Sequence, residues 1–350
     1  YFNNPCDQWG RPHVYGDILL NIPYIKKFPS FYFLYLPLML NAIFLYSIIN
    51  LFTFKNKTEY LCLFFIVLSA PVILAIERSN MDIVIFLLVI LISKNKNILL
   101  NHLVLIFATL IKFYPICMII IFLFKKEIKK VAINIVIFLL IIIMSFFFQL
   151  ESLIKIFDNK SLITAFGIYD FSFKGGIDFL INFKITIYNK NYDFIKYLYV
   201  TLILIIPVLT TILLSFKSVF NNNSVSKLFF ENNFENRMYI LSSTIILFCY
   251  FVFSNFFYRE IFFLGLIPWL LKYRHVIENK FINSYFYVLV FKFFASTLLI
   301  FLVQNNIFQS FNGFIILTKY CLDLYLIIVV LTIFLISVKS YYKNFLTQAI

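Results

Sequence analysis

The chain has 350 residues, of which 62% are hydrophobic and 13% are charged, whereas about 25% of the residues in a soluble domain are charged. With a mean hydropathy of +0.93, this composition excludes a soluble globular protein, a disordered tail and a small disulfide-rich scaffold. It predicts an all-α integral membrane protein, a polytopic bundle of about 10–12 helices, several of them short or broken. The net charge of +14 predicts basic cytoplasmic loops rather than a nucleic-acid partner.

The first 30 residues are polar for this chain, and we interpret them as an outer loop with one more hydrophobic span expected upstream of Tyr1. Asp7 lies close in sequence to Trp9 and Arg11. A tryptophan ring stacks on the C–H face of a sugar, and a carboxylate accepts a hydroxyl proton. The loop is therefore typical of sugar chemistry, although a turn set by its Pro and Gly residues explains the same pattern equally well.

Apolar stretches divide the chain into membrane segments, because a helix needs about 20 apolar residues to cross a bilayer core of about 30 Å. Seven stretches are predicted to cross: Phe31–Phe54, Tyr60–Ile76, Val131–Leu150, Ile195–Phe216, Tyr239–Phe257, Phe281–Val303 and Phe314–Val338. Four shorter stretches predict broken or re-entrant helices: Met81–Ser93, Ile98–Ile111, Tyr114–Phe124 and Ile261–Leu271.

We interpret residues 1–350 as one polytopic membrane domain with two polar interruptions, a long outer loop at 151–194 and an inner linker at 221–236. The outer loop is expected to form an interfacial helix pair or, in the alternative, a flap that binds the acceptor or carrier. If the segments alternate with the first loop outside, the inner connections hold 16 basic and five acidic residues, and the outer ones hold 12 basic and ten acidic residues. Since positive charge accumulates on the cytoplasmic side, this orientation places most other polar residues on the outer face.

A second polar cluster, Glu77-Arg78-Ser79-Asn80-Met81-Asp82, lies between two apolar segments. Such groups are costly beside lipid, so they are expected to face a polar cavity or one another. Asn80 and Asp82 would also cap the helix that follows. A purely structural role, with an internal ion pair between Arg78 and a carboxylate, is the alternative.

Two further clusters lie at outer junctions. Lys112-Phe113-Tyr114-Pro115 joins two short apolar pieces, and Pro115 predicts a helix break there; a snorkelling Lys112 is the alternative. Asn255-Phe256-Phe257-Tyr258-Arg259-Glu260 precedes another short piece. If Arg78, Lys112 and Arg259 converge in space, they form a good phosphate or diphosphate site, because arginine gives bidentate contacts.

These stretches resemble, in order, the motifs of membrane glycosyltransferases of the GT-C superfamily, and in particular of glycosyltransferase family 87, the polyprenol-phosphate-mannose-dependent mannosyltransferase group. The stretch 77–82 resembles E-R-G-N-x-D, with Ser79 in place of Gly, and the stretch 112–115 resembles K-x-Y-P. The stretch 255–259 resembles N-x-x-Y-R, with Phe257 at a commonly acidic position, and the stretch 4–12 resembles N-P-x-D-x-x-x-R-P.

The resemblance implies a GT-C-like bundle that transfers mannose or a related hexose from a polyprenyl-phosphate donor to a glycan or glycolipid acceptor. The reaction is expected on the outer face of a bacterial inner membrane. Carried over to this chain, the catalytic base is Asp7, with Asp17 as second choice, and the donor phosphate contacts are Arg78, Lys112 and Arg259. The expected supporting residues are Glu77, Asn80, Asp82, Tyr114, Asn255 and Tyr258.

We expect no cofactor and no metal site, because the three histidines of the chain lack metal-ligand spacing; an Asp pair that holds a divalent ion is the alternative. Two other functions remain open from the sequence. One is a transporter or flippase of lipids or solutes in cell-envelope polysaccharide synthesis, for which Lys292, Lys319 and Asp323 are candidate groups within the membrane. The other is a non-catalytic membrane subunit.

Overall fold

The structure is a computed structural model. It describes residues 30–52, 56–78, 80–124, 128–148, 150, 154, 169–179, 228–229, 231–252, 256–274, 280–305 and 312–349. Several expectations lie outside the described residues: Asp7, Asp17, Ser79, Asn255, the span Ile195–Phe216, and most of the predicted outer loop and inner linker. By contacts the chain divides into two compact units, one of residues 1–47 and 76–164 and the other of residues 48–75 and 165–350.

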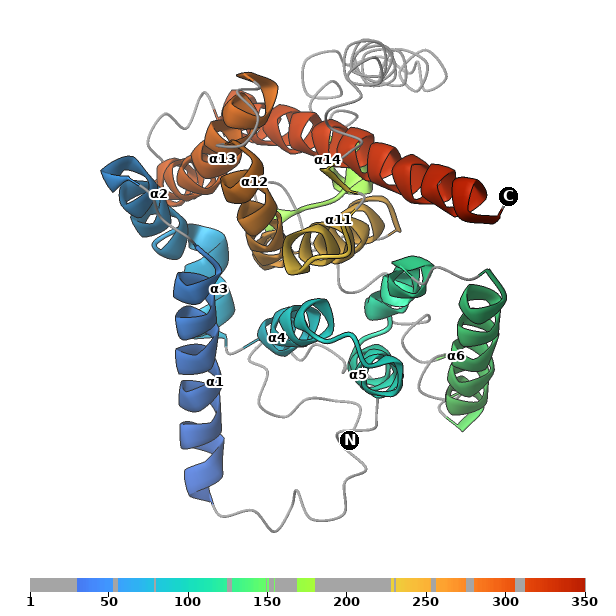
Figure 1. Ribbon diagram of the computed structural model, residues 1–350. Helices are drawn as coiled ribbons and strands as arrows, with labels where there is room; N and C mark the ends of the chain where they lie inside the picture. The colour runs from blue at the N-terminus through green and yellow to red at the C-terminus, as the bar shows by residue number, and fades with distance from the viewer. Residues whose placement is uncertain are drawn as a thin grey trace, which may run out of the picture. The chain divides into compact units, whose positions relative to one another are not determined.

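The regular elements named in the described part of the chain are all helical, which confirms the prediction of an all-α membrane protein (Figure 1). The α-helices are α1 (Ser30–Leu51), α2 (Lys57–Val67), α3 (Ala70–Glu77), α4 (Met81–Lys94), α5 (Ile98–Ile111), α6 (Ile128–Phe148), α11 (Phe234–Val252), α12 (Ile267–Arg274), α13 (Lys280–Gln304) and α14 (Asn312–Ala349). The 3-10 helices are η3 (Tyr114–Phe124) and η6 (Phe257–Leu266).

Within the described residues, three helices contain a stretch that is long and apolar enough to span a membrane: Lys129–Phe147, Ile282–Gln304 and Ile315–Ser340. Three of the four short pieces predicted from the sequence are also present, because α4, α5 and η3 begin and end at or within one residue of the predicted bounds. The fourth, Ile261–Leu271, is divided in the structure between η6 and α12. The 3-10 form lengthens η3 to roughly 22 Å at 2.0 Å per residue. This is still shorter than a bilayer core of about 30 Å, so the helix is too short to cross alone.

Asparagine side chains begin three of these helices. Asn56 accepts a hydrogen bond from the backbone N–H of Glu59, at 3.0 Å, before α2. Asn80 does the same for the N–H of Asp82, also at 3.0 Å, before α4, and Asn97 caps α5. Because the first N–H groups of a helix have no partner within it, the abundant asparagines fix where these short apolar helices start.

The predicted span Tyr60–Ile76 is bent in the structure, where two helices together are long and apolar enough to cross a membrane. The structure ends α2 at Val67 and begins α3 at Ala70, with a bend of 48° between them. The cause is Pro71, whose ring would clash with the carbonyl group four residues earlier in a continuous helix. The backbone N–H of Ala70 donates instead to the Thr297 hydroxyl, at 2.9 Å, so the break is held by α13.

The first unit is built on α4, α5, η3 and α6, which pack in sequence order. The Phe86 ring of α4 contacts the Phe44 ring of α1 edge to face, at 5.6 Å between centroids. Between α5 and α6, the His102 ring stacks on Phe122 and lies 3.3 Å from the carbonyl oxygen of Asn134. These contacts lie between the facing sides of the helices of the first unit.

The second unit packs α11 against η6, α12 and α14, and packs α13 against α14, α12 and α2 (Figure 1). Its core contains an aromatic cluster, in which the Trp269 ring stacks on Phe229 at 5.0 Å between centroids and lies tilted against Tyr239 at 4.8 Å. At the end of α12, Arg274 pairs with the buried Glu59 at 3.5 Å. Gly265 of η6 lies directly against α11, because a Cβ atom there would be 1.9 Å from the Ser242 Oγ atom.

We expect Gly265→Ala to lower the free energy of unfolding by about 1–3 kcal/mol, the usual cost of overpacking a core. Thermal unfolding in detergent measures this change. The added Cβ would also lie 2.8 Å from the Ser242 Cβ atom, so adding Ser242→Gly should recover most of the loss despite its own helix cost of about 0.5–1 kcal/mol. An unchanged unfolding temperature in Gly265→Ala would contradict this packing.

Candidate functional site

Residues from two of the sequence motifs form one buried polar cluster in the first unit. The Lys112 Nζ atom lies 2.8 Å from the Asp82 Oδ1 atom and 3.2 Å from the Asn80 Oδ1 atom. The Tyr114 hydroxyl donates to the same Asp82 oxygen, at 2.5 Å. We call Asn80, Asp82, Lys112 and Tyr114 the motif cluster.

The motif cluster depends on two helix breaks. Asn80 stands at the N-cap of α4, which places Asp82 in the first turn, where the helix dipole favours a carboxylate. Lys112 has an extended backbone between α5 and η3, where the break expected from Pro115 occurs. Each break therefore directs one half of the ion pair toward the other.

Burial separates the members of the motif cluster from their neighbours. Asp82 is fully buried and Lys112 is only 4% exposed, so the snorkelling alternative for Lys112 is wrong. Glu77 and Arg78, at the end of α3, are exposed. The sequence left open an internal pair between Arg78 and a carboxylate, and the ion pair that the structure gives Asp82 is with Lys112.

The fourth sequence cluster begins η6 in the second unit. The Tyr258 side chain is buried, and its ring stacks on Phe256 at 5.7 Å between centroids. The backbone N–H of Arg259 donates to the Phe256 carbonyl oxygen at 3.1 Å, and the Arg259 side chain is half-buried. The first turn of η6 thus fixes the backbone at Arg259, a predicted contact to the donor phosphate, and at Tyr258, a predicted supporting residue.

Arg78 and Lys112 belong to one compact unit and Arg259 belongs to the other. The convergence of these three cations on one phosphate therefore remains a prediction. The base predicted at Asp7, its second choice Asp17 and the supporting residue Asn255 lie outside the described residues.

A buried charge network in the second unit was only partly visible in the sequence. Glu260, Lys292, Lys319 and Asp323 are each at most 1% exposed and form ion pairs with one another. Lys319 and Asp323 lie one helical turn apart, a spacing typical of a paired face. Lys292 and Glu260 are remote in sequence, so only the packing of η6 and α13 against α14 identifies them as partners.

Among the residues that the structure describes, there is no group of three or more His, Cys, Asp or Glu side chains placed to hold a metal ion. The charges of the motif cluster are carried by a carboxylate and an ammonium group. An ammonium group that a carboxylate holds in place can bind and orient an anionic group through hydrogen bonds and charge.

The fold and the motif cluster define an all-α, multi-pass membrane protein in which two short polar motifs meet at the start of a helix. The model of glycosyltransferase family 87 matches residues 22–226, more than half of the chain, and the chain belongs to that family. It is a membrane glycosyltransferase, which confirms the resemblance found in the sequence and favours this function over a transporter or a non-catalytic subunit.

The matched residues include both motifs of the motif cluster, whereas Asp7, Asp17 and η6 lie outside them. No curated protein and no solved structure matches the chain.

We expect Lys112→Met to lower the free energy of unfolding by about 3–5 kcal/mol, because it leaves the Asp82 charge buried without its partner. Tyr114→Phe removes one hydrogen bond to a charged acceptor and should cost less, about 1.5–3 kcal/mol. Equilibrium unfolding in detergent compares the two variants.

The double variant Asp82→Asn/Lys112→Met provides the control for this pair. Its loss in free energy of unfolding should be smaller than the sum of the losses of Asp82→Asn alone and Lys112→Met alone. The difference should be about 0.5–3 kcal/mol, as for groups in direct contact. Lys96→Gln, at an exposed position, should stay within about 0.5 kcal/mol of the wild type. Strictly additive losses at Asp82 and Lys112 would contradict a shared buried pair.

Proposed function

We propose that this glycosyltransferase moves mannose or a related hexose from a polyprenyl-phosphate donor to a glycan or glycolipid acceptor. The proposal places the reaction on the outer, non-cytoplasmic face of a bacterial inner membrane, in cell-envelope synthesis. The observation that carries it is the Asp82–Lys112 ion pair, at 2.8 Å, which joins the two family motifs at the start of α4. Membership of family 87 supports the transfer of a sugar.

In the proposed reaction the acceptor oxygen forms a bond to the anomeric carbon, and the bond from that carbon to the donor phosphate breaks. The acceptor hydroxyl loses its proton to a carboxylate, for which Asp7 is the proposed general base and Asp17 the second choice. The polyprenyl phosphate leaves with the electron pair of the broken bond. Its negative charge grows as the bond breaks, and fixed cations stabilise that charge.

Arg78, Lys112 and Arg259 are the proposed phosphate contacts. Arg78 is exposed near the cap of α4, and Lys112 is held at the same helix start, where the N–H groups and the helix dipole favour an anion. Glu77, Asn80, Asp82, Tyr114, Asn255 and Tyr258 support these contacts, as the motif cluster does for Lys112. The lipid tail of the donor lies along the apolar helices, where its burial contributes to binding.

Asp7→Asn should lower kcat roughly 100- to 10,000-fold, the usual contribution of a general base. The assay measures transfer of labelled mannose from polyprenyl-phosphate-mannose to a glycolipid. A parallel reaction offers a nucleotide sugar as the alternative donor. Asp17→Asn is the matched control and should keep most of the activity. Wild-type turnover in Asp7→Asn would reject this base, and transfer from the nucleotide sugar alone would reject the proposed donor.

The same assay with EDTA tests whether a divalent ion takes part. Undiminished turnover is expected, because the proposed reaction needs no cofactor. Loss of turnover that Mg²⁺ or Mn²⁺ restores would favour the alternative, an Asp pair that holds the ion.

Arg78→Gln and Arg259→Gln should each lower kcat/KM for the donor by roughly tenfold to a hundredfold, because each removes a charge-assisted contact to phosphate. Replacement by Lys should recover only part of the loss, since lysine cannot make the bidentate contact. Exposed Lys96→Gln is the matched charge control. If the two arginines bind one phosphate, the double variant will be non-additive; additive losses would contradict a common site.

A further inference from the structure

The buried charge network of the second unit joins three helices. The Lys292 Nζ atom of α13 lies 3.0 Å from the Glu260 Oε1 atom of η6 and also pairs with Asp323 of α14. The Lys319 Nζ atom of α14 lies 2.6 Å from the Asp323 Oδ2 atom and 3.6 Å from the Glu260 Oε1 atom. Two lysines and two carboxylates balance in charge, so the network is formally neutral.

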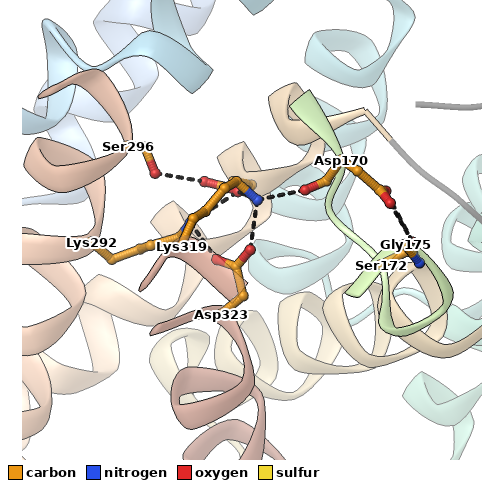
Figure 2. A network of polar contacts seen from close by, with 8 residues as sticks. Asp170, Ser172, Gly175, Lys292, Ser296, Lys319 and Asp323 are labelled. Carbon is orange, nitrogen blue, oxygen red and sulfur yellow. Dashed lines mark hydrogen bonds and ion pairs between the residues drawn. The ribbon is translucent and has the colours of Figure 1, made fainter. Parts of the chain in front are cut away.

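The network also holds a segment remote in sequence, residues 169–172. Figure 2 shows Lys319 between Asp323 and Asp170, with Ser296 on the other side of the network. Lys319 Nζ donates to the backbone carbonyl oxygen of Asp170, and the Ser172 hydroxyl donates to the Asp170 carboxylate at 2.9 Å. A Cβ atom on Gly175 would lie 1.2 Å from that carboxylate, so the residue at 175 is glycine for lack of space.

Both ends of the network act on the first turn of η6. Glu260 lies in that turn and is held by Lys292 at 3.0 Å and by the Ser296 hydroxyl at 3.3 Å. Asp170 forms an antiparallel β-bridge with Phe256, the residue directly before η6. The backbone between these two anchors consists of Phe257, Tyr258 and Arg259.

The 3-10 geometry of η6 points the side chains of Glu260 and Arg259 to different sides of the helix. Consecutive residues of a 3-10 helix are about 120° apart around its axis, because one turn has three residues. Glu260 is fully buried in the network, whereas its neighbour Arg259 is half-buried on another side of the helix. A fixed Glu260 therefore fixes the direction in which Arg259 leaves the helix.

The energetic cost of the network favours a positioning role over simple stabilisation. Four ionised groups lose their hydration in this core, and well-packed apolar side chains often stabilise such a core as well or better. Ionisable residues inside a membrane protein are costly and generally serve the functional site. Here the ion pairs and hydrogen bonds of the network hold the turn of η6 that carries Tyr258 and Arg259.

We propose that Glu260, Lys292, Lys319 and Asp323 are positioning residues that hold Tyr258 and Arg259 for the donor phosphate. This inference rests on the proposed function, because Arg259 is its proposed phosphate contact. None of the four residues contacts the donor in this proposal. They act through the first turn of η6 and through its bridge to Asp170.

The test uses the charge-balanced variant Lys319→Met/Asp323→Asn in the full-length protein in detergent or nanodiscs. It removes the contact to Asp170 and leaves Glu260 paired with Lys292. We expect kcat/KM for polyprenyl-phosphate-mannose to fall roughly tenfold to a hundredfold, since misplacement by about 1 Å can cost a hundredfold. The KM for the acceptor should not change. Amide hydrogen exchange should become faster in peptides that cover 169–179 and 256–266.

The matched control is Glu59→Gln/Arg274→Met, which removes another buried ion pair of the same unit, at the end of α12. It should lower the unfolding temperature to a similar degree, with wild-type donor kinetics and wild-type exchange at η6. If both variants lose donor kcat/KM in proportion to the fall in their unfolding temperature, the proposal is overturned, because the network would then be purely structural. Wild-type kcat/KM in the network variant would overturn it as well.

Glu260→Asp is the second variant, for the case that the first does not fold. It keeps the charge but shortens the side chain by one methylene, so it should give an intermediate loss of donor kcat/KM with faster exchange at 256–266. Wild-type kinetics and exchange in this variant would overturn the proposal. If the wild type transfers no sugar from a polyprenyl phosphate, the proposed function fails. The positioning role is tested separately, since unchanged amide hydrogen exchange at 256–266 in the network variants would overturn it.

Discussion

A charge inside an apolar protein core loses its hydration, and this loss costs several kcal/mol unless an opposite charge or hydrogen bonds replace the water. The described part of the chain meets this constraint with ion pairs between side chains that are remote in sequence, Asp82 with Lys112 and Glu260 with Lys292. Each pair can form only if the helices that carry it pack in one register. The need to neutralise buried charge therefore favours one packing of the helices over others.

Broken helices make these pairs possible. Lys112 lies in extended backbone between α5 and η3, and Glu260 lies in the first turn of η6. Both positions are at the N-terminal side of a long 3-10 helix, a form that is uncommon beyond three or four residues and that often marks strain or function. Lys112 and Arg259, two of the proposed phosphate contacts, thus stand where regular α-helix stops, and one buried ion pair includes Lys112 itself and another includes Glu260 beside Arg259.

The proposed reaction uses this arrangement to place fixed positive charge beside a lipid phosphate. Charge stabilisation works best when the groups are already oriented before the bond breaks, because no reorganisation is then needed during the reaction. In the first unit the motif cluster orients Lys112 at the start of α4. In the second unit the charge network is proposed to orient the turn that carries Arg259. The family relationship supports sugar transfer, and in the proposal the two buried ion pairs hold the phosphate contacts Lys112 and Arg259 in separate parts of the chain.

The class of protein, the positions of most helices and the family are predicted correctly from the amino-acid sequence, because apolar length and short motifs are local properties. The sequence predicted Ile98–Ile111 and Tyr114–Phe124 with the bounds that the structure gives, but it missed the break at Pro71 inside an otherwise apolar run. The partners of the buried charges, by contrast, follow from the packing of the helices. The sequence alone is compatible with a snorkelling Lys112 and does not link Glu260 to Lys292, because the choice of partner depends on packing between helices and leaves no local pattern in the sequence.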